Sequence, residues 1–265
     1  NKAHLKTYSE LLAGIDNPTD TVPATLKKLQ QTIMRLDCLR TIESDIKSFI
    51  SKHHGPDAAD WPAIWQSIKL VWASKWNERA FISRRSRGIP HELLHIAVLI
   101  QQVVSAEYSF VIHTVNPFDL NRDEIYAEIV PGLGETLVGN YPGRAMSFAC
   151  SKSLPNPKIL MYPSKSFGLH GSGLIFRSDS NGEDLPGYAG AGLYDSIMPT
   201  EPQTFCIDYS GDRLCVDPIF QHEMMSKITE IGTIIENQLN GPQDIEGCFR
   251  EGRYFVVQAR PQVGL

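Results

Sequence analysis

Residues 177–192 constrain the fold and chemistry of this chain more than any other stretch, because they join an arginine to a glycine-rich, acidic loop. The apolar residues 174–176 predict the end of a β-strand, so Arg177 should leave the strand terminus with its guanidinium held in place. A fixed guanidinium binds phosphate oxygens in a bidentate way. Glycines at positions 182, 187, 190 and 192 permit positive φ and let backbone N–H groups approach an anion. The run predicts a polyphosphate site, although such loops also occur as plain turns.

A second informative stretch, residues 242–261, predicts two short strands around a Glu-Gly turn. Asp244 and Glu246 are two residues apart, and so are Gln258 and Arg260. Because side chains alternate between the two faces of a strand, each pair shares one face. The length of the turn then decides whether the two pairs meet.

A turn of two residues would send the polar pairs to opposite faces of the hairpin. A turn of three residues, 251–253, sets Glu246 opposite Gln258 and Asp244 opposite Arg260, and we choose it because three-residue turns with a left-handed glycine are common. Hard oxygen ligands of this kind suit Mg²⁺, which completes its shell with water and phosphates. The alternative is an exposed hairpin whose charged pairs cover a sheet edge.

Both segments resemble the nucleotide-binding domain shared by pyruvate phosphate dikinase, phosphoenolpyruvate synthase and the α-glucan, water dikinases. The resemblance runs from about residue 60 to the C-terminus. The amino-acid sequence is most similar to that of the α-glucan, water dikinases at residues 72–80, 110–114, 132–139 and 141–145. The resemblance implies an α+β fold of the ATP-grasp-like type, in which ATP lies between two lobes. We expect a mainly helical segment, 1–87, and a nucleotide-binding region, 88–265.

The same resemblance implies roles for the polar residues of the hairpin and the glycine-rich run. Arg177 and Arg260 would be catalytic residues that contact the ATP phosphates. Glu246 and Gln258 would hold Mg²⁺, and Asp244 would complete the shell of phosphate and metal contacts.

The adenine of ATP would be bound by main-chain groups of a predicted strand, residues 97–103. The candidates are Gln101, Gln102 and Val103, and their side chains are expected to belong to an ordinary buried strand.

The reaction implied by the resemblance splits ATP between two acceptors. The β-phosphate goes to a histidine on a mobile domain of the same polypeptide and then to a glucosyl hydroxyl of an α-glucan held by other domains. The γ-phosphate goes to water, so AMP and phosphate are also released. Two alternatives stay open: the ATP-binding domain of a pyruvate or phosphoenolpyruvate dikinase, and a glucan-binding or interaction module that does not use ATP.

Some features of the family are not found in the sequence. None of the eight histidines follows a serine, as the carrier histidine of the family does. Residues 1–60 do not resemble the family's first lobe with its phosphate-binding lysine, and the chain opens on Asn1. We therefore expect a C-terminal piece of a larger enzyme, which by itself binds nucleotide weakly and turns nothing over.

Charge and cysteine content restrict the partners and the compartment. The net charge of -5 and the pI near 5.9 argue against nucleic acid or anionic membranes as the main partner. Five cysteines without paired metal spacing predict a reducing compartment, plastid or cytosol, and small core side chains.

The coarse pattern predicts several further elements. Residues 1–87 look helical, with breaks near 14–23 and 53–60, and four tryptophans should form one core stripe: Trp61, Trp65, Trp72 and Trp76. Residues 150–173 predict a turn-rich connection, 205–216 a hairpin, and 218–239 an amphipathic helix that packs on the sheet of the final hairpin. Glu124 and Glu128 could face the nucleotide, but we expect them to be solvated strand carboxylates.

Overall fold

The computed structural model describes residues 2–15, 22–55, 60–139, 141–183, 185, 190 and 192–265. The chain divides into two compact units. The first unit comprises Asn1–Val103, Gly173–Leu185 and Gly190–Glu201, and the second comprises Val104–Ser172, Pro186–Ala189 and Pro202–Leu265. Helices and antiparallel sheets are combined in both, which confirms the α+β class. The division into domains at residues 87 and 88 stays a prediction.

The first unit contains the helices of the N-terminal third of the chain, as predicted. They are α1 (Lys2–Gly14), α2 (Val22–Met34), α3 (Arg40–His54), α4 (Trp61–Ala73), the 3₁₀ helix η1 (Ser74–Trp76), α5 (Glu78–Ser86) and the 3₁₀ helix η2 (His91–Leu93). The predicted breaks lie between α1 and α2 and between α3 and α4, and a further one at residues 35–39 was not predicted. Helix α4 begins where Asp60 accepts a hydrogen bond from the Ala63 amide at 3.1 Å.

The predicted tryptophan stripe is confirmed for three of its four members. Trp61 stacks on Trp65 with ring centroids 6.0 Å apart, and Trp65 meets Trp72 edge-on at 5.6 Å. All three lie on α4 and are half-buried. Trp76 leaves the stripe because the helix tightens into η1 at Ser74, and it is buried at 1% exposure in a different cluster.

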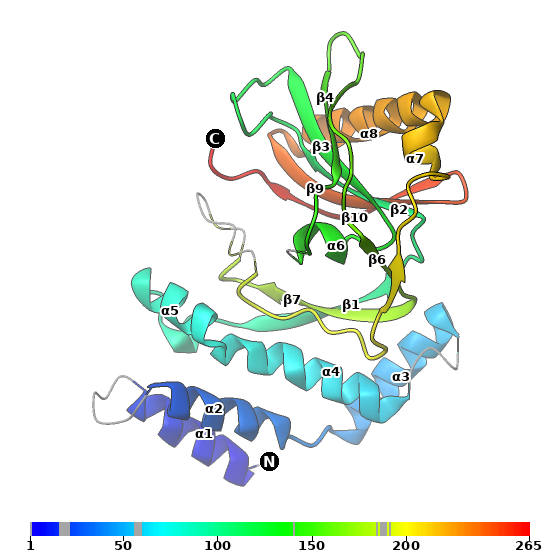
Figure 1. The fold of residues 1–265 in the computed structure, drawn as a ribbon. Helices are drawn as coiled ribbons and strands as arrows, with labels where there is room; N and C mark the ends of the chain where they lie inside the picture. Colours follow the sequence, from blue (N-terminus) through cyan, green and yellow to red (C-terminus); the bar gives the residue numbers. More distant parts are fainter. Residues whose placement is uncertain are drawn as a thin grey trace. The chain divides into compact units, whose positions relative to one another are not determined.

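A two-stranded antiparallel ribbon, β1 (Ile96–Val103) and β7 (Gly173–Ser180), completes the first unit. Leu174 and Phe176 of β7 are buried in a cluster with Ile64, Ile68 and Val71 of α4. Helix α4 therefore lies against one face of the ribbon (Figure 1).

The second unit is built on a six-stranded antiparallel sheet with the strand order β10-β9-β2-β3-β4-β5. Its strands are β2 (Tyr108–His113), β3 (Glu124–Pro131), β4 (Met146–Ser151), β5 (Lys158–Met161), β9 (Gln243–Arg250) and β10 (Arg253–Pro261). The other elements are α6 (Glu135–Val138), β6 (Phe167–His170), β8 (Gln203–Cys206), α7 (Arg213–Val216) and α8 (Pro218–Leu239), and β6 pairs with β8.

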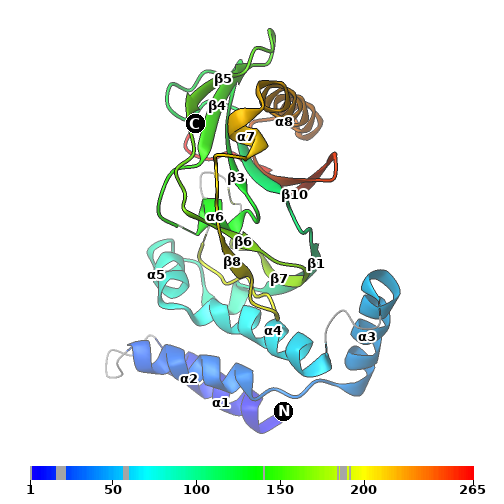
Figure 2. The same ribbon diagram turned by 45° about the vertical axis from the view of Figure 1, so that its right-hand side comes forward.

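Helix α8 lies across one face of the six-stranded sheet (Figure 1, Figure 2). Its predicted span is confirmed, and it begins where the Asp217 carboxylate accepts hydrogen bonds from the amides of the first turn. Met224 and Ile228 of the helix are fully buried with Ile112 and Ile245 of the sheet. This core fixes which face of β9 points away from the helix.

Two loop predictions were wrong. Residues 205–216 do not form a hairpin, because Asp212 instead caps α7 by accepting from the Leu214 amide at 2.8 Å. The preceding strand β8 pairs with β6, so the stretch 150–173 also contains strands. The prolines that suggested a turn-rich connection, Pro155, Pro157 and Pro163, lie on either side of β5.

All five cysteines are free thiols. Cys150 and Cys248 are buried, as expected of core residues, whereas Cys206 is exposed and contradicts that expectation. Across the described ranges, each helix is too short or too polar to cross a membrane.

Candidate nucleotide and metal site

The closing hairpin brings the four predicted polar residues together in pairs. Gln258 of β10 lies opposite Glu246 of β9, and Arg260 lies opposite Asp244. The predicted pairing is therefore confirmed, and all four side chains share one face of the hairpin because cross-strand partners point the same way.

The turn that produces this pairing differs from the predicted one. Arg253 pairs directly with Arg250, so the turn has two residues, Glu251 and Gly252, with positive φ of 50° and 77°. Two consecutive left-handed residues are typical of a type I′ turn. The pairing is restored further along by a β-bulge, since Val257 is an extra residue between Val256 and Gln258. The prediction of a three-residue turn was wrong, and the bulge supplies the residue that it required.

One carboxylate of the face is already engaged by an arginine. Arg260 donates from Nε at 3.0 Å and from Nη2 at 2.7 Å to the same oxygen, Oδ2 of Asp244. The side chains are 21% and 16% exposed, so this ion pair is only partly screened by solvent. Ile245 lies between Asp244 and Glu246 on β9, and its side chain points into the core under α8 with 0% exposure. The core thus determines that Asp244 and Glu246 face away from the helix.

The polar face continues onto the neighbouring strands, which agrees with the alternative in which Glu128 faces the nucleotide site. Glu128 of β3 lies on the same row of the sheet as Glu246, with Val111 of β2 between them. The Tyr126 hydroxyl donates to Oε1 of Glu128 at 2.8 Å. Burial is the larger cause and this contact with the carboxylate the next, and together they raise the pKa of Tyr126 to about 12.

The expectation that Glu124 and Glu128 are solvated was wrong. Both are half-buried, and Glu124 accepts a hydrogen bond from Asn116 Nδ2 at 2.6 Å. The alternating pattern of residues 124–129 did contain a signal, because it places both glutamates and Tyr126 on one face.

The donor set of the hairpin fits a magnesium ion. Glu246 and Gln258 offer one carboxylate and one amide oxygen from directly opposite positions. Mg²⁺ is usually held by one or two carboxylates together with substrate phosphates, so a small protein donor set is sufficient. In the described part of the chain, no group of three or more His, Cys, Asp or Glu side chains is arranged to hold a metal.

Arg177 lies inside β7 and not at its end, because the strand continues to Ser180. It faces Leu99 across the ribbon and is half-buried. Alternation along β7 puts Arg177 on the face opposite the buried Leu174 and Phe176. The arginine is therefore held by a paired strand, on the side of the ribbon that turns away from α4.

The adenine candidates form the end of β1. On the neighbouring strand β7, Gln101 pairs with Ile175, Gln102 with Leu174 and Val103 with Gly173. The predicted strand is confirmed with one additional residue, Ile96.

The start of the glycine-rich loop is anchored to the segment before β1. Asn181 accepts from the His95 amide and donates to the Leu93 carbonyl, both at 2.8 Å. Glu183 accepts from the Ser178 hydroxyl at 2.8 Å.

The glycines of this loop fulfil different requirements. Gly190 and Gly192 have positive φ of 66° and 71°, as predicted. Gly182 has no positive φ, but a Cβ at this position would lie 2.3 Å from the Leu94 side chain. Close packing against Leu94 therefore explains why a glycine is found there. Gly187 lies outside the described residues, together with residues 184, 186, 188, 189 and 191.

Arg177 and the adenine candidates belong to the first unit, whereas the four hairpin residues belong to the second. Their convergence on one nucleotide therefore stays a prediction.

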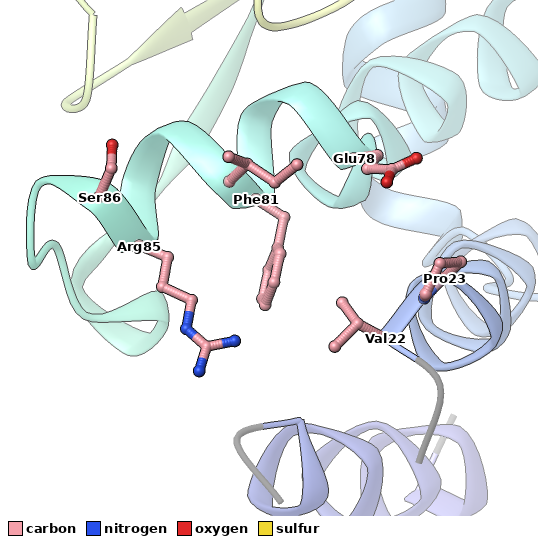
Figure 3. A pocket seen from close by; sticks show the side chains of 7 residues that line it. Val22, Pro23, Glu78, Phe81, Arg85 and Ser86 are labelled. Atoms are coloured by element: carbon pink, nitrogen blue, oxygen red, sulfur yellow. The ribbon is translucent and has the colours of Figure 1, made fainter. Parts of the chain in front are cut away.

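A separate cavity of about 440 Å³ lies in the first unit between α2 and α5 (Figure 3). Phe81 and Val22 point into it, and Arg85 lies at its side. The cavity contains none of the predicted nucleotide-binding residues and is lined mainly by apolar atoms.

Comparison with known proteins shows which proteins these elements resemble. Residues 58–145 match the family model described as the pyruvate phosphate dikinase AMP/ATP-binding domain. The chloroplastic α-glucan water dikinase of Citrus reticulata is 48% identical over 247 residues, which cover 91% of this chain and 17% of that protein. α-Glucan water dikinase 1 of Arabidopsis thaliana is 49% identical over 245 residues, 90% of this chain and 18% of the relative. The phosphoenolpyruvate synthase of Pyrococcus furiosus is 25% identical over 196 residues, 73% of this chain and 21% of the relative.

Over residues 58–145 the chain is therefore similar to the AMP/ATP-binding domain of the dikinase class, and its α+β fold is consistent with that class. More particularly, it is homologous to a segment of the α-glucan water dikinases, with phosphoenolpyruvate synthases as more distant relatives. The chain spans less than a fifth of the plant relatives' length. A match over 91% of the chain also includes most of residues 1–60, which the expected resemblance had left out.

Proposed function

We propose that this chain is the nucleotide-binding domain of an α-glucan, water dikinase. The observation that carries the proposal is the hairpin face on which Glu246 opposes Gln258 and Asp244 binds Arg260. Identity of 48% to a plant α-glucan water dikinase, against 25% to a phosphoenolpyruvate synthase, supports the glucan branch over the pyruvate branch.

In this proposal the hairpin residues bind the metal-bound triphosphate. Glu246 and Gln258 hold Mg²⁺, which would neutralise phosphate charge as the phosphoryl groups separate. Arg260 contacts a phosphate oxygen and keeps its orientation through the ion pair with Asp244. Phosphoryl transfer depends mainly on positioning and charge neutralisation, so these groups are chemically sufficient contributions from one domain.

The first unit supplies the other contacts in this proposal. Arg177 is carried by a paired strand and contacts the phosphates, while the main chain of Gln101, Gln102 and Val103 binds the adenine edge. The glycine-rich run that follows Arg177 would contribute backbone N–H groups to binding of the phosphates.

The proposed reaction transfers the β-phosphate of ATP to a histidine on a separate domain of the same polypeptide, and then to a glucosyl residue of a starch-like glucan. The γ-phosphate is released to water. Both plant α-glucan water dikinases compared above are named as chloroplastic, which supports a plastid location, and the five free thiols agree with a reducing compartment.

The test uses ATP labelled at the β-phosphate and the complete dikinase that carries this sequence. Arg177→Ala and Glu246→Ala should each abolish labelling of the carrier histidine while the protein stays folded. Arg253→Ala is the matched control, because Arg253 is an exposed residue at the start of β10, next to the turn of the same hairpin, and this variant should label normally. Retained labelling in either site variant would reject the proposed site.

The same label separates the candidate functions. Transfer to glucan supports the α-glucan, water dikinase, and transfer to pyruvate supports the alternative dikinase. Calorimetry with MgATP, with Arg260→Ala as a control, tests whether nucleotide is bound at all. Glucan binding that is unaffected by nucleotide would favour a module without ATP chemistry.

A further inference from the structure

A row of four polar side chains crosses the second unit's sheet beside the metal candidates. Arg260 of β10, Asp244 of β9, His113 of β2 and Tyr126 of β3 occupy directly opposed positions on adjacent strands. Such residues point to the same face of the sheet. His113 therefore stands next to the ion pair on which the proposed phosphate contact depends.

The two carboxylate oxygens of Asp244 face different partners. Oδ2 accepts both hydrogen bonds from Arg260. Oδ1 lies 3.8 Å from Nδ1 of His113, whose side chain is 30% exposed. This distance is longer than a hydrogen bond, but contacts of catalytic groups often tighten when substrate binds. His113 therefore stands beside the Asp244 oxygen opposite the one that accepts from Arg260.

The ring of His113 is itself fixed from the other side. It stacks on Tyr126 with centroids 6.1 Å apart and planes 22° apart. Tyr126 is buried at 8% exposure and is oriented by its hydrogen bond to Glu128. The chain of contacts thus runs from a buried tyrosine through the imidazole to Asp244.

We propose that His113 is a positioning residue of the nucleotide site, which orients Asp244 and thereby aligns Arg260. The link to phosphoryl transfer rests on the proposed function, whereas the link to Arg260 rests on the contacts alone. A guanidinium that is misaligned by a fraction of an ångström stabilises developing phosphate charge less well, so the rate should suffer more than nucleotide affinity.

Three substitutions of His113 separate the contribution of its Nδ1 atom from the contribution of the stacked ring. Asparagine carries a polar atom at the same number of bonds from Cβ as Nδ1, phenylalanine keeps a ring that can stack on Tyr126, and alanine keeps neither. In the complete dikinase, His113→Asn should retain most of the rate of histidine phosphorylation. His113→Phe and His113→Ala should lose about tenfold in kcat, with KM for MgATP changed by less than about threefold. A fully active His113→Phe variant beside an impaired His113→Asn variant would overturn the proposal.

A spectroscopic measurement on the 265-residue chain does not depend on activity. The Nε–H signal of Arg260, assigned by its loss in Arg260→Lys, should exchange slowly with solvent in the wild type and in His113→Asn. In His113→Phe the exchange should be at least about tenfold faster, because the carboxylate that holds this proton is less well oriented. Unchanged exchange in His113→Phe would reject the positioning role. Failure of the wild type to use MgATP would instead reject the proposed function and leave this measurement decisive.

Discussion

Glu246 and Gln258 face each other across the final hairpin even though the turn between their strands has only two residues. A regular hairpin with that turn would place Glu246 opposite Val257 and divide the polar pairs between two faces. The β-bulge at Val257 compensates for the short turn. The metal candidates therefore depend on an irregularity in β10 as well as on their own side chains.

The turn itself should be sensitive to a single methyl group. Gly252 has a φ of 77° with open space around its Cβ position, so Gly252→Ala adds backbone strain without a steric clash. We expect a loss of about 1–2 kcal/mol in the free energy of unfolding, measured by urea denaturation. Gly211→Ala, also in open space but without positive φ, should change it by less than about 0.5 kcal/mol. Equal effects of the two substitutions would contradict the turn geometry.

The core under β9 should hold the site in place. Ile245 is 0% exposed beneath α8, and Ile245→Ala should lower the free energy of unfolding of the second unit by about 2–5 kcal/mol. Leu239, at the end of the same helix, is 54% exposed, and its substitution by alanine should have an effect below about 0.5 kcal/mol. All four tryptophans lie in the first unit, so their fluorescence would report the unfolding of that unit. Circular dichroism, which also detects the secondary structure of the second unit, is the better probe.

Removal of the amide ligand should affect the metal requirement specifically. If Gln258 binds Mg²⁺, Gln258→Ala should raise the Mg²⁺ concentration for half-maximal nucleotide binding by about tenfold. Titration of Mg²⁺ at constant ATP measures this shift, and binding of metal-free ATP should stay within about twofold of the wild type. Arg253→Ala should leave both values unchanged. A Gln258→Ala variant with an unchanged metal requirement would exclude Gln258 as a ligand.

Lys75 should give the first unit a pH-dependent stability. Its ammonium donates to the carbonyls of His91 and Leu94, and burial, helped by the nearby Arg84, lowers its pKa from 10.5 to about 8. Below the folded-state value the lysine is charged in both states and its desolvation opposes folding in full. Between about 8 and 10.5 the folded state binds fewer protons than the unfolded state, so its stability rises with pH.

The lysine contribution is isolated by comparison with Lys75→Met. The free energy of unfolding of the wild type, minus that of the variant, should increase as the pH rises through this window. Urea denaturation at several pH values measures the difference, and other titrating groups cancel because both proteins contain them. A difference that is constant or falls with pH would contradict the depressed pKa.

The thiols should separate clearly by their reactivity. Cys206 is exposed, whereas Cys150 and Cys248 are buried and burial raises the pKa of Cys248 to about 11. At neutral pH a maleimide should modify Cys206 within minutes and leave the two buried thiols unmodified until the protein is unfolded. Peptide mass spectrometry identifies the modified positions. Modification of Cys248 in the folded protein would show that the sheet opens readily.

The elements that could be predicted from the sequence are those determined by local pattern. Helix α8 shows three-to-four spacing of apolar residues between Pro218 and Asn240, and both ends are as expected. Alternation by two placed each polar pair of the hairpin on one face of its strand, whereas the meeting of the two pairs was predicted from a three-residue turn that the structure does not contain. By contrast, the bulge at Val257 has no local signature, since a valine fits a regular strand equally well.

Other features depended on contacts between distant segments. Asp212 looked like a turn residue, but it caps α7 and accepts a hydrogen bond from Tyr108, more than a hundred residues earlier. Similarly, the short strand β8 pairs with β6 and not with its neighbours in sequence. The place of His113 beside Asp244 required the order of strands in the sheet, which alternation alone does not reveal.

The strand β10 is the outermost member of its sheet, with β9 as its neighbour among the strands that the structure describes. Two of the four polar side chains of the hairpin are therefore carried by the part of the sheet that frays most easily. Detachment of β10 from β9 would separate Gln258 from Glu246 and Arg260 from Asp244 at the same time. Occupancy by ligand and the hydrogen-exchange protection of the β10 amides should consequently rise and fall together.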